Sequence, residues 1–182
     1  ASRGLGDVYK RQILTEGIVL YDSGECQLAT PCELNYSEIL QMAEEYYDTQ
    51  FNRGKRFIRY TQIAYADNEI KDSSFFLHQA SESFLKSIPL VYILYGYKEH
   101  ELEFLIERCK PYTLELAKVF PCDTKEEERL FKLLQRAYIE SRYNPDFEIT
   151  KEDIDLLMPK AEMLRDIVAV SYTHLTLPTN SR

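Results

Sequence analysis

Tryptophan is absent from the sequence, and the four cysteines, at positions 26, 32, 109 and 122, form no Cys-x-x-Cys pair. Zinc sites and redox-active disulfides usually bring two cysteines that close together, so we expect reduced thiols and no metal or other cofactor. The longest apolar run is far shorter than the about 20 residues that a membrane-spanning helix needs. No N-terminal stretch has the length and flanks of a signal peptide. The sequence therefore predicts a cytoplasmic protein that does not enter a membrane.

Positive charge is also scarce. Lys and Arg number 22 against 30 Asp and Glu, which gives a formal net charge of −8. So acidic a chain is a poor match for non-specific binding along a phosphate backbone, and no DNA partner is expected. The one dense basic cluster indicates either a solvated helix face or a contact with RNA or an associated domain. Its members are Arg53, Lys55, Arg56 and Arg59.

What the chain does contain is enough apolar material for a core, with 14 Tyr and 9 Phe to supply the aromatic packing. The stretch Ser73–Tyr97 organises the rest, because its apolar residues recur at steps of three and four and predict a helix. Its second half is apolar on every side, which is typical of a buried central helix. Pro89 should kink or split this helix, and Gly96 should end it.

The first half of this stretch carries a polar stripe. His78, Glu82 and Lys86 follow one another at intervals of four residues, with Gln79 beside them. On a helix, this spacing places the three side chains on one face. Two interpretations stay open: a site that holds a base or a phosphate, and a buried histidine that is simply satisfied by the carboxylate one turn on.

Further helices are predicted on both sides of the central one. Asn35 or Ser37 can cap a helix that runs to about Ala66, with a break near residues 52–54. Thr124 to Glu127 has the pattern of a capping box, and Thr150 opens the last helix. With short loops between them, four to five helices predict an all-α, antiparallel up-and-down bundle. His100 is expected to serve as a cap or turn residue.

The ends of the chain look different from its body. Residues 1–12 and 170–182 show no helical or strand pattern that joins their neighbours, and both resemble translated read-through of sequencing adapters at the edge of a metagenomic fragment. We therefore expect an artefactual segment at each end. Residues 13–33 hold two β-prone runs around a turn signal, which predicts a hairpin or a strand remnant. Residues 34–169 form the helical domain.

Three blocks of the sequence resemble a known family. FFLHQASESFLKSIPLVYILYGYKEHELEFL is similar to the HEPN domain, in which a helix with an LHQ-A-x-E core precedes a Y-K-x-H-x-L step. VFPCDTKEEERLFKLLQRAYIESRYNPDFEIT resembles the second half of that domain, where AY-x-x-x-RY ends the fourth helix. EGIVLYDSG resembles the closing strand of the minimal nucleotidyltransferase that precedes HEPN in one subgroup. The resemblance implies a helical bundle, as the periodicity does.

Many HEPN proteins are metal-independent ribonucleases that use Arg-x(4–6)-His at a dimer interface, where the histidine acts on the ribose hydroxyl. Counted from Arg142, the allowed positions hold Phe147, Glu148 and Ile149, and none is histidine. Moving the 2′-hydroxyl proton without a metal needs a group whose pKa lies near neutrality, usually histidine. The Gly-Ser and Asp-x-Asp motif of nucleotidyltransferases is absent as well. We therefore expect no catalytic residues in this sequence.

The resemblance and these departures together predict a non-catalytic HEPN domain that binds nucleotide or RNA and supports a fused or associated nucleotidyltransferase. Two alternatives stay open. One is a divergent ribonuclease of the toxin type, in a toxin–antitoxin-like setting, with Arg142 and His78 in place of the usual pair. The other is a dimerisation module without a ligand, and a homodimer is compatible with all three. The candidate binding residues are His78, Gln79, Glu82, Arg142 and Tyr143, with the basic cluster as a secondary patch.

Overall fold

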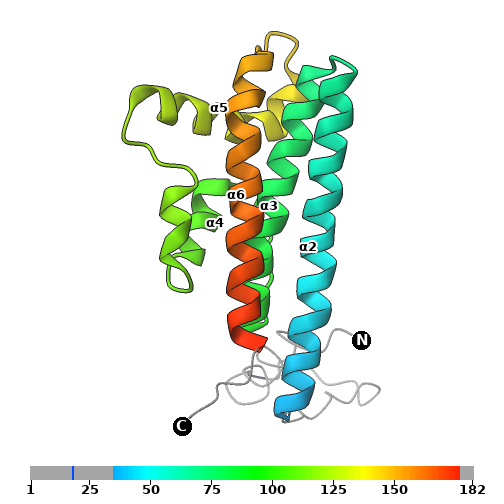
Figure 1. Ribbon diagram of the computed structural model, residues 1–182, viewed down its shortest axis with the longest axis vertical. Coiled ribbons are helices and arrows are strands. Elements are labelled where there is room, and N and C mark those ends of the chain that lie inside the picture. Colours follow the sequence, from blue (N-terminus) through cyan, green and yellow to red (C-terminus); the bar gives the residue numbers. More distant parts are fainter. Residues whose placement is uncertain (1–17, 19–34, 177–182) are drawn as a thin grey trace.

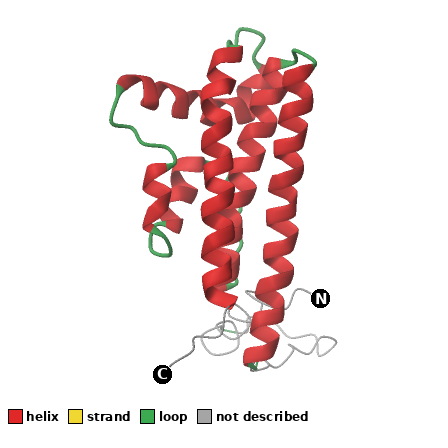
Figure 2. Ribbon diagram, in the orientation of Figure 1, coloured by secondary structure: helices red, strands yellow, loops and turns green. Residues whose placement is uncertain are grey.

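The computed structural model describes Ile18 and residues 35–176, and the account below concerns these residues. They form an all-α bundle with no strand among them, which confirms the predicted fold class (Figures 1 and 2). The predicted hairpin and the segment 1–12 lie outside the described residues, apart from Ile18. The elements are α2 (Tyr36–Ala66), α3 (Ile70–Ile93), α4 (Leu102–Cys109), the 3₁₀ helix η1 (Leu114–Lys118), α5 (Lys125–Tyr143) and α6 (Lys151–Thr176).

The helix α3 is the centre of the bundle and packs against α2, α4, α5 and α6. Figure 1 shows α2, α3 and α6 as long rods along the main axis, with α2 antiparallel to the other two. Leu77, Ala80, Phe84 and Leu85 of α3 are fully buried. A helix that buries residues around most of its circumference needs neighbours on every side. The predicted role of the stretch Ser73–Tyr97 as the buried core is therefore confirmed.

The helix α2 runs without a break, so the interruption expected near residues 52–54 is wrong. Gly54 is helical and buried, and it faces Phe84 of α3. A Cβ atom added to Gly54 would lie 2.4 Å from Cε1 of the Phe84 ring. This glycine therefore serves the close approach of two helices, and the helix tolerates its weak propensity because packing offsets it.

The end of α3 also differs from expectation. Pro89 lies inside the helix, which ends at Ile93 with Leu94 in the left-handed region at φ 51°, and Gly96 lies beyond it. Proline has no N–H, so the carbonyl of Leu85 loses its partner four residues on. The Sγ atom of Cys109 in α4 lies 3.3 Å from this carbonyl and donates to it. A side chain from another helix thus compensates the proline, and α3 continues past it.

The starts of α2, α5 and α6 are set by local side chains, as the sequence predicts. Asn35 caps α2 and Thr124 caps α5, each in a capping box that satisfies two backbone N–H groups. At the start of α6, Thr150 and Asp153 exchange hydrogen bonds of 3.0 and 3.2 Å in the same manner. Arg129 of α5 also donates to Asp153 at 2.5 Å, which ties α5 to α6.

The helix α6 continues past Ala169 to Thr176, so the expectation of no helical pattern joining residues 170–182 to their neighbours is wrong for this part. Tyr172 stacks on Tyr47 of α2, with ring centroids 3.7 Å apart and planes 7° from parallel. These turns therefore contribute to the packing between α6 and α2. Among the helices described, none has both the length and the apolar character needed to cross a bilayer.

Candidate functional site

The polar stripe of α3 is buried and centres on Glu82. His78 is fully buried, and the exposed fractions of Gln79 and Glu82 are below one tenth. Gln79 donates from Nε2 to Oε2 of Glu82 at 3.0 Å. Nδ1 of His78 lies 3.9 Å from the same carboxylate oxygen. The sequence-predicted residues 78, 79 and 82 are therefore in contact, as the helical spacing indicates.

The other carboxylate oxygen of Glu82 binds two further groups. Oε1 lies 2.8 Å from Nζ of Lys86 and 3.0 Å from Nδ1 of His100. Burial raises the pKa of Glu82, but the hydrogen bonds from Lys86 and His100 outweigh it, and the pKa lies below its ordinary value. The site thus contains an ionised carboxylate that positions an ammonium group and an imidazole ring.

His100 is a candidate site residue that the sequence analysis underestimated. It lies in the extended segment before α4 and pairs with Glu82, eighteen positions away, instead of only serving as a cap or turn. Nearly half of its side chain is exposed, at 48%. The Y-K-x-H-x-L step contains this residue, and that step is the signal from which its role could have been inferred.

Tyr138 of α5 links the two histidines. Its ring stacks on His100 with centroids 4.7 Å apart and on His78 with centroids 5.1 Å apart. Burial lowers the pKa of His78 to about 4, so the ring is neutral near pH 7. The Nε2 atom of His78 is buried and has no hydrogen-bond partner among the described residues. His78 is therefore a neutral, fully buried member of the cluster.

Arg142 and Tyr143 lie at the end of α5, at the surface. Arg142 donates from Nε and Nη2 to the carbonyl of Tyr138 at 3.0 and 2.6 Å. Its guanidinium lies over the rings of Phe75 and Tyr138, 4.7 and 4.9 Å from their centroids. Within the described part of the chain Arg142 forms no ion pair with Glu82. The structure thus joins Arg142 to the histidine pair only through the Tyr138 ring.

A hollow of about 360 Å³ opens beside Glu82, and we call it the polar hollow. Its lining residues come from α2, from α3 and from the segment between α3 and α4. Arg53, Lys86 and His100 are its nitrogen-bearing lining residues other than Gln50, and Tyr46 and Tyr97 are the aromatic ones. The guanidinium of Arg53 lies over the ring of Phe57, 5.6 Å from its centroid. The lining residues are Tyr46, Thr49, Gln50, Arg53, Glu82, Lys86, Leu90, Gly96, Tyr97 and His100.

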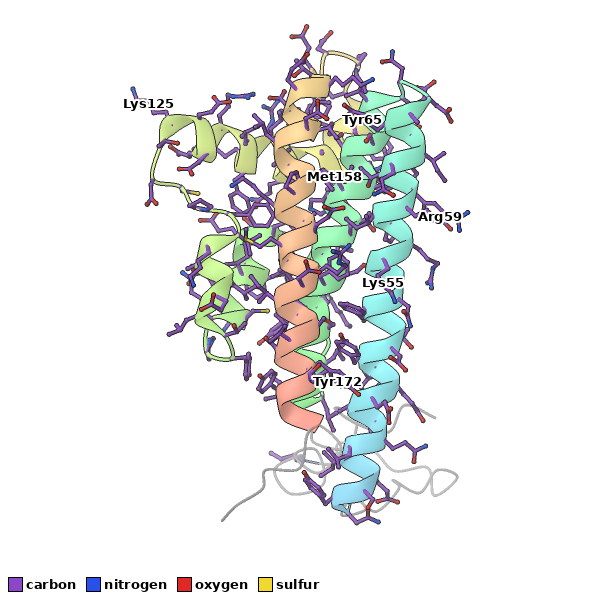
Figure 3. All side chains as sticks on the ribbon, in the orientation of Figure 1. Lys55, Arg59, Tyr65, Lys125, Met158 and Tyr172 are labelled. Atoms are coloured by element: carbon purple, nitrogen blue, oxygen red, sulfur yellow. The ribbon has the colours of Figure 1, made fainter. Side chains whose placement is uncertain are left out.

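The basic cluster of α2 is divided between two faces. Arg53 lines the polar hollow, whereas Arg59, six residues on, lies about 240° further around the helix. Figure 3 shows Arg59 pointing away from the bundle. Lys55 lies over the ring of Phe51, with Nζ 5.4 Å from its centroid, and Arg56 is exposed. The cluster is therefore not one continuous patch, and only Arg53 belongs to the site.

In the residues that the structure describes, no group of three or more His, Cys, Asp or Glu side chains is arranged to hold a metal ion. Guanidinium and ammonium groups bind phosphate oxygens, and tyrosine rings stack on bases.

The described residues thus form an all-α bundle whose central helix carries a buried His-Gln-Glu cluster. The family model for the HEPN domain matches residues 47–171, and the chain belongs to the HEPN family. None of the curated proteins searched matches the chain. The match covers α3 to α5 and most of α2 and α6, so the predicted family is confirmed. HEPN domains are generally related to RNA, and they commonly bind RNA and dimerise.

Proposed function

We propose that this HEPN domain binds a nucleotide or an RNA end in the polar hollow without cleaving it. The observation that carries the proposal is the convergence of Arg53, Lys86 and His100 on one hollow from separate segments of the chain. Its volume of about 360 Å³ lies within the range of small-molecule sites, which is about 300–1,000 Å³. Arg53 and Lys86 are suited to phosphate, and Tyr97 to the face of a base.

Glu82 organises this arrangement. Its negative charge is compensated by Lys86, and its hydrogen bond to Nδ1 of His100 fixes the orientation of that ring. Because Glu82 is buried and bound on both oxygens, it holds these side chains in place before a ligand arrives. Preorganised groups lose less conformational entropy on binding, which favours affinity.

Calorimetric titration with ATP, GTP and short RNA tests the proposal. We expect heat of binding with at least one of them, and a loss of affinity of about tenfold in Arg53→Gln, as one charge-assisted contact is removed. Arg59→Gln is the matched control, since it removes the same charge from the other face of α2. Absence of heat with every ligand, on folded protein, or equal losses in both variants, would contradict the proposal.

A second candidate function is a divergent ribonuclease, and one observation favours it. His100 and Arg142 both lie on the ring of Tyr138, and His100 is half-exposed with Nδ1 held by Glu82. A carboxylate that orients an imidazole leaves Nε2 available for proton transfer. His100 is thus better suited than the buried His78 to transfer a proton to or from RNA. Cleavage of RNA that disappears in both His100→Ala and Arg142→Ala would establish this function, whereas unchanged cleavage would indicate contamination.

Support of a nucleotidyltransferase is part of the same proposal. It depends on the EGIVLYDSG block, most of which lies outside the described residues. A Gly-Ser pair followed by Asp-x-Asp in the reading frame upstream of Ile13 would support the fusion. The remaining alternative, a dimerisation module without ligand, predicts a dimer by mass measurement in solution together with no heat in any titration.

A further inference from the structure

The imidazole ring of His100 is held in one orientation at the polar hollow. Its Nδ1 atom lies 3.0 Å from Oε1 of Glu82, and the ring stacks on Tyr138 with centroids 4.7 Å apart. Nearly half of the side chain is nevertheless exposed, and no described residue forms a hydrogen bond with Nε2. The nitrogen that a ligand in the hollow can meet is therefore Nε2.

Glu82 determines which nitrogen carries the proton when this ring is neutral. The pKa of Glu82 lies below its ordinary value, so the carboxylate is ionised near pH 7 and accepts the hydrogen bond from Nδ1. A neutral imidazole has a single N–H group, and Nε2 then has only a lone pair. Ionised phosphate oxygens are acceptors too, so a neutral His100 cannot bind them. A second proton, on Nε2, converts the ring into a phosphate-binding group.

The fixed charges of the hollow are too few to compensate a phosphate group. Glu82 and Lys86 form an ion pair at 2.8 Å, and their charges cancel. Arg53 is the one further fixed charge among the lining residues. A phosphate monoester has a charge of about −1.5 to −2 near pH 7, which exceeds the charge of one guanidinium group. A protonated His100 supplies the second positive charge.

The other groups around His100 do not titrate near neutral pH. Burial lowers the pKa of His78 to about 4, so that ring stays neutral. Phenol, ammonium and guanidinium groups ordinarily titrate near pH 10 or above, carboxylates near pH 4, and histidine between pH 5 and 8. The titratable and charged side chains that face or adjoin His100 are His78, Glu82 and Lys86 of α3, Tyr138 of α5, Tyr46 and Arg53 of α2, and Tyr97, Lys98, Glu99 and Glu101 of the chain beside it.

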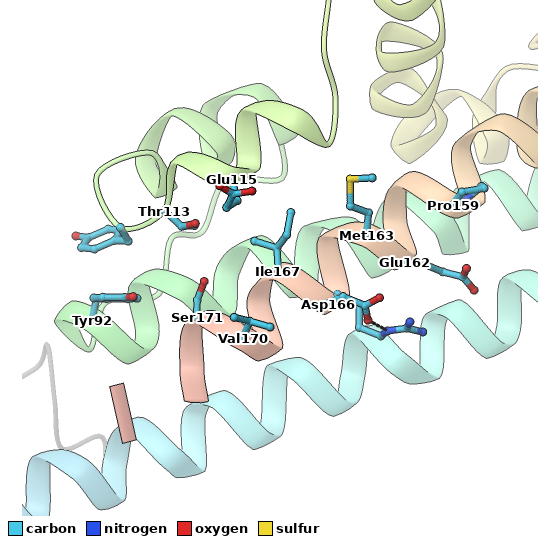
Figure 4. Close-up of a pocket in the computed structure, with 12 residues that line it drawn as sticks. Tyr92, Thr113, Glu115, Pro159, Glu162, Met163, Asp166, Ile167, Val170 and Ser171 are labelled. Carbon is cyan, nitrogen blue, oxygen red and sulfur yellow. Dashed lines mark hydrogen bonds and ion pairs between the residues drawn. The ribbon is translucent and has the colours of Figure 1, made fainter. Parts of the chain in front are cut away.

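A larger depression of the described residues does not offer the same chemistry. It has a volume of about 910 Å³ and lies between α6 and the segment that contains η1 (Figure 4). No histidine lines it, and its one basic lining residue, Arg165, binds Asp166 at 2.8 Å. The polar hollow is therefore the better place for a phosphate group.

We propose that His100 takes up a proton from solvent when a phosphate group binds in the polar hollow. The protonated ring donates from Nδ1 to Glu82 and from Nε2 to a phosphate oxygen, and no covalent bond forms or breaks. The hollow thereby selects phosphate-bearing ligands over nucleosides, and its affinity for them rises as the pH falls from 8 to 6. This inference rests on the proposed function and adds how the site recognises the anion.

Calorimetric titration at pH 7.5, in buffers that differ in ionisation enthalpy, measures the protons taken up on binding. The probes are ATP and a 5′-phosphorylated RNA of four nucleotides, whose phosphates are almost fully ionised at this pH. We expect uptake of about 0.3 to 1 proton per ligand in wild type and almost none in His100→Gln. By linkage, the wild-type affinity should fall about two- to tenfold for each pH unit above 6.5. Adenosine, which has no phosphate, should bind more weakly and without uptake.

Lys98→Gln is the matched control variant, since it removes an exposed charge two residues before His100 and should keep the uptake. His100 is half-exposed, so His100→Gln should keep the circular dichroism and the melting temperature of wild type. The proton NMR resonance of the His100 ring, assigned by its loss in His100→Gln, gives a second measurement. It should move to the position of a protonated ring when ATP is added at pH 7.5.

The possible failures are distinguishable. Binding of ATP or the RNA with equal uptake in wild type and His100→Gln, or with an unchanged His100 resonance, would overturn this inference and leave the proposed function intact. Equal uptake with adenosine would do the same, because the proton would not depend on phosphate. If neither ATP nor the RNA binds to folded protein, the proposed function and this inference are both wrong.

Discussion

At the scale of the residue, Glu82 decides the character of the site. A buried carboxylate is stable only if its charge is compensated and its oxygens are bound. Lys86 supplies the charge, and Gln79 and His100 supply further hydrogen bonds. Lys86 and His100 keep the group ionised, because their hydrogen bonds and charges outweigh the effect of burial on its pKa. The polar stripe is therefore both a structural unit of the core and the base of the polar hollow.

Replacement of Lys86 tests how much the buried Glu82 carboxylate depends on its charged partner. We expect Lys86→Met to lower the free energy of unfolding at pH 7 by about 2 to 3 kcal/mol, because hydrogen bonds to charged groups contribute that much and the carboxylate stays buried. Urea unfolding measures the change. Lys132→Met is a matched control, since Lys132 pairs with Glu128 at the same spacing of four residues on an exposed face. A Lys86 variant as stable as the control would show that the pair contributes little.

His78 makes the stability depend on pH. Its pKa is about 4 in the folded chain because of burial, against an ordinary value of 6.5. The unfolded chain therefore binds a proton that the folded chain does not, between pH 6.5 and about 4. Stability should be complete above pH 6.5 and fall by about 3 kcal/mol as the pH decreases to 4.

Unfolding titrations at a series of pH values test this dependence. In His78→Leu the decline between pH 6.5 and 4 should be much smaller, since the titrating group is gone. His100→Gln removes an exposed ring instead and should keep most of the decline. An equal decline in His78→Leu and wild type would assign the pH dependence to other groups.

At the scale of the element, Gly54 sets the distance between α2 and α3. The Cβ added in Gly54→Ala would overlap the Phe84 ring and force the helices apart, at a cost of about 1 to 3 kcal/mol. Alanine regains about 1 kcal/mol of helix propensity, so we expect the free energy of unfolding to fall by about 0 to 2 kcal/mol. Arg56→Ala, at an exposed position of the same helix, should change stability little. A stabilised Gly54→Ala variant would mean that the ring moves aside at low cost.

The elements themselves were largely predictable, because their signals are local. Asn35 and Thr124 cap helices through residues three positions away, and the apolar steps of α3 follow from the period of the helix. The errors concern contacts between elements. The space at Gly54 depends on Phe84, and the continuation of α3 past Pro89 depends on Cys109. Single-sequence patterns contain no information about such partners.

In the candidate site, too, contacts within one helix were predictable from the sequence, and contacts between elements were not. Residues 78, 79 and 82 lie on one helix, and their contact follows from spacing. The pairing of Glu82 with His100 requires the chain to return after α3, and the inclusion of Arg53 requires α2 to pack beside it. Conversely, the Tyr138 ring connects Arg142 with the histidines, and no sequence pattern indicates that one ring contacts all three.

At the scale of the whole molecule, the last turns of α6 close the bundle against the start of α2. We expect Tyr172→Ala to lower the free energy of unfolding by about 1 to 3 kcal/mol, because a stacked aromatic pair with the buried Tyr47 is lost. Tyr143→Ala removes a ring that is 73% exposed and is the control. Chemical denaturation of both variants gives the comparison. No loss at Tyr172 would indicate that the residues after Ala169 contribute nothing to the fold.

The reactivity of the Cys109 thiol offers a way to measure local opening of the bundle. It is buried between α4 and α3, and burial raises its pKa to about 12, so it is unreactive while the two helices stay together. Cys122 is exposed. An alkylating reagent should therefore label Cys122 promptly and Cys109 only when α4 separates from α3. The ratio of the two labelling rates therefore reports how often α4 separates from α3, and its change on addition of a ligand would show whether binding alters this local opening.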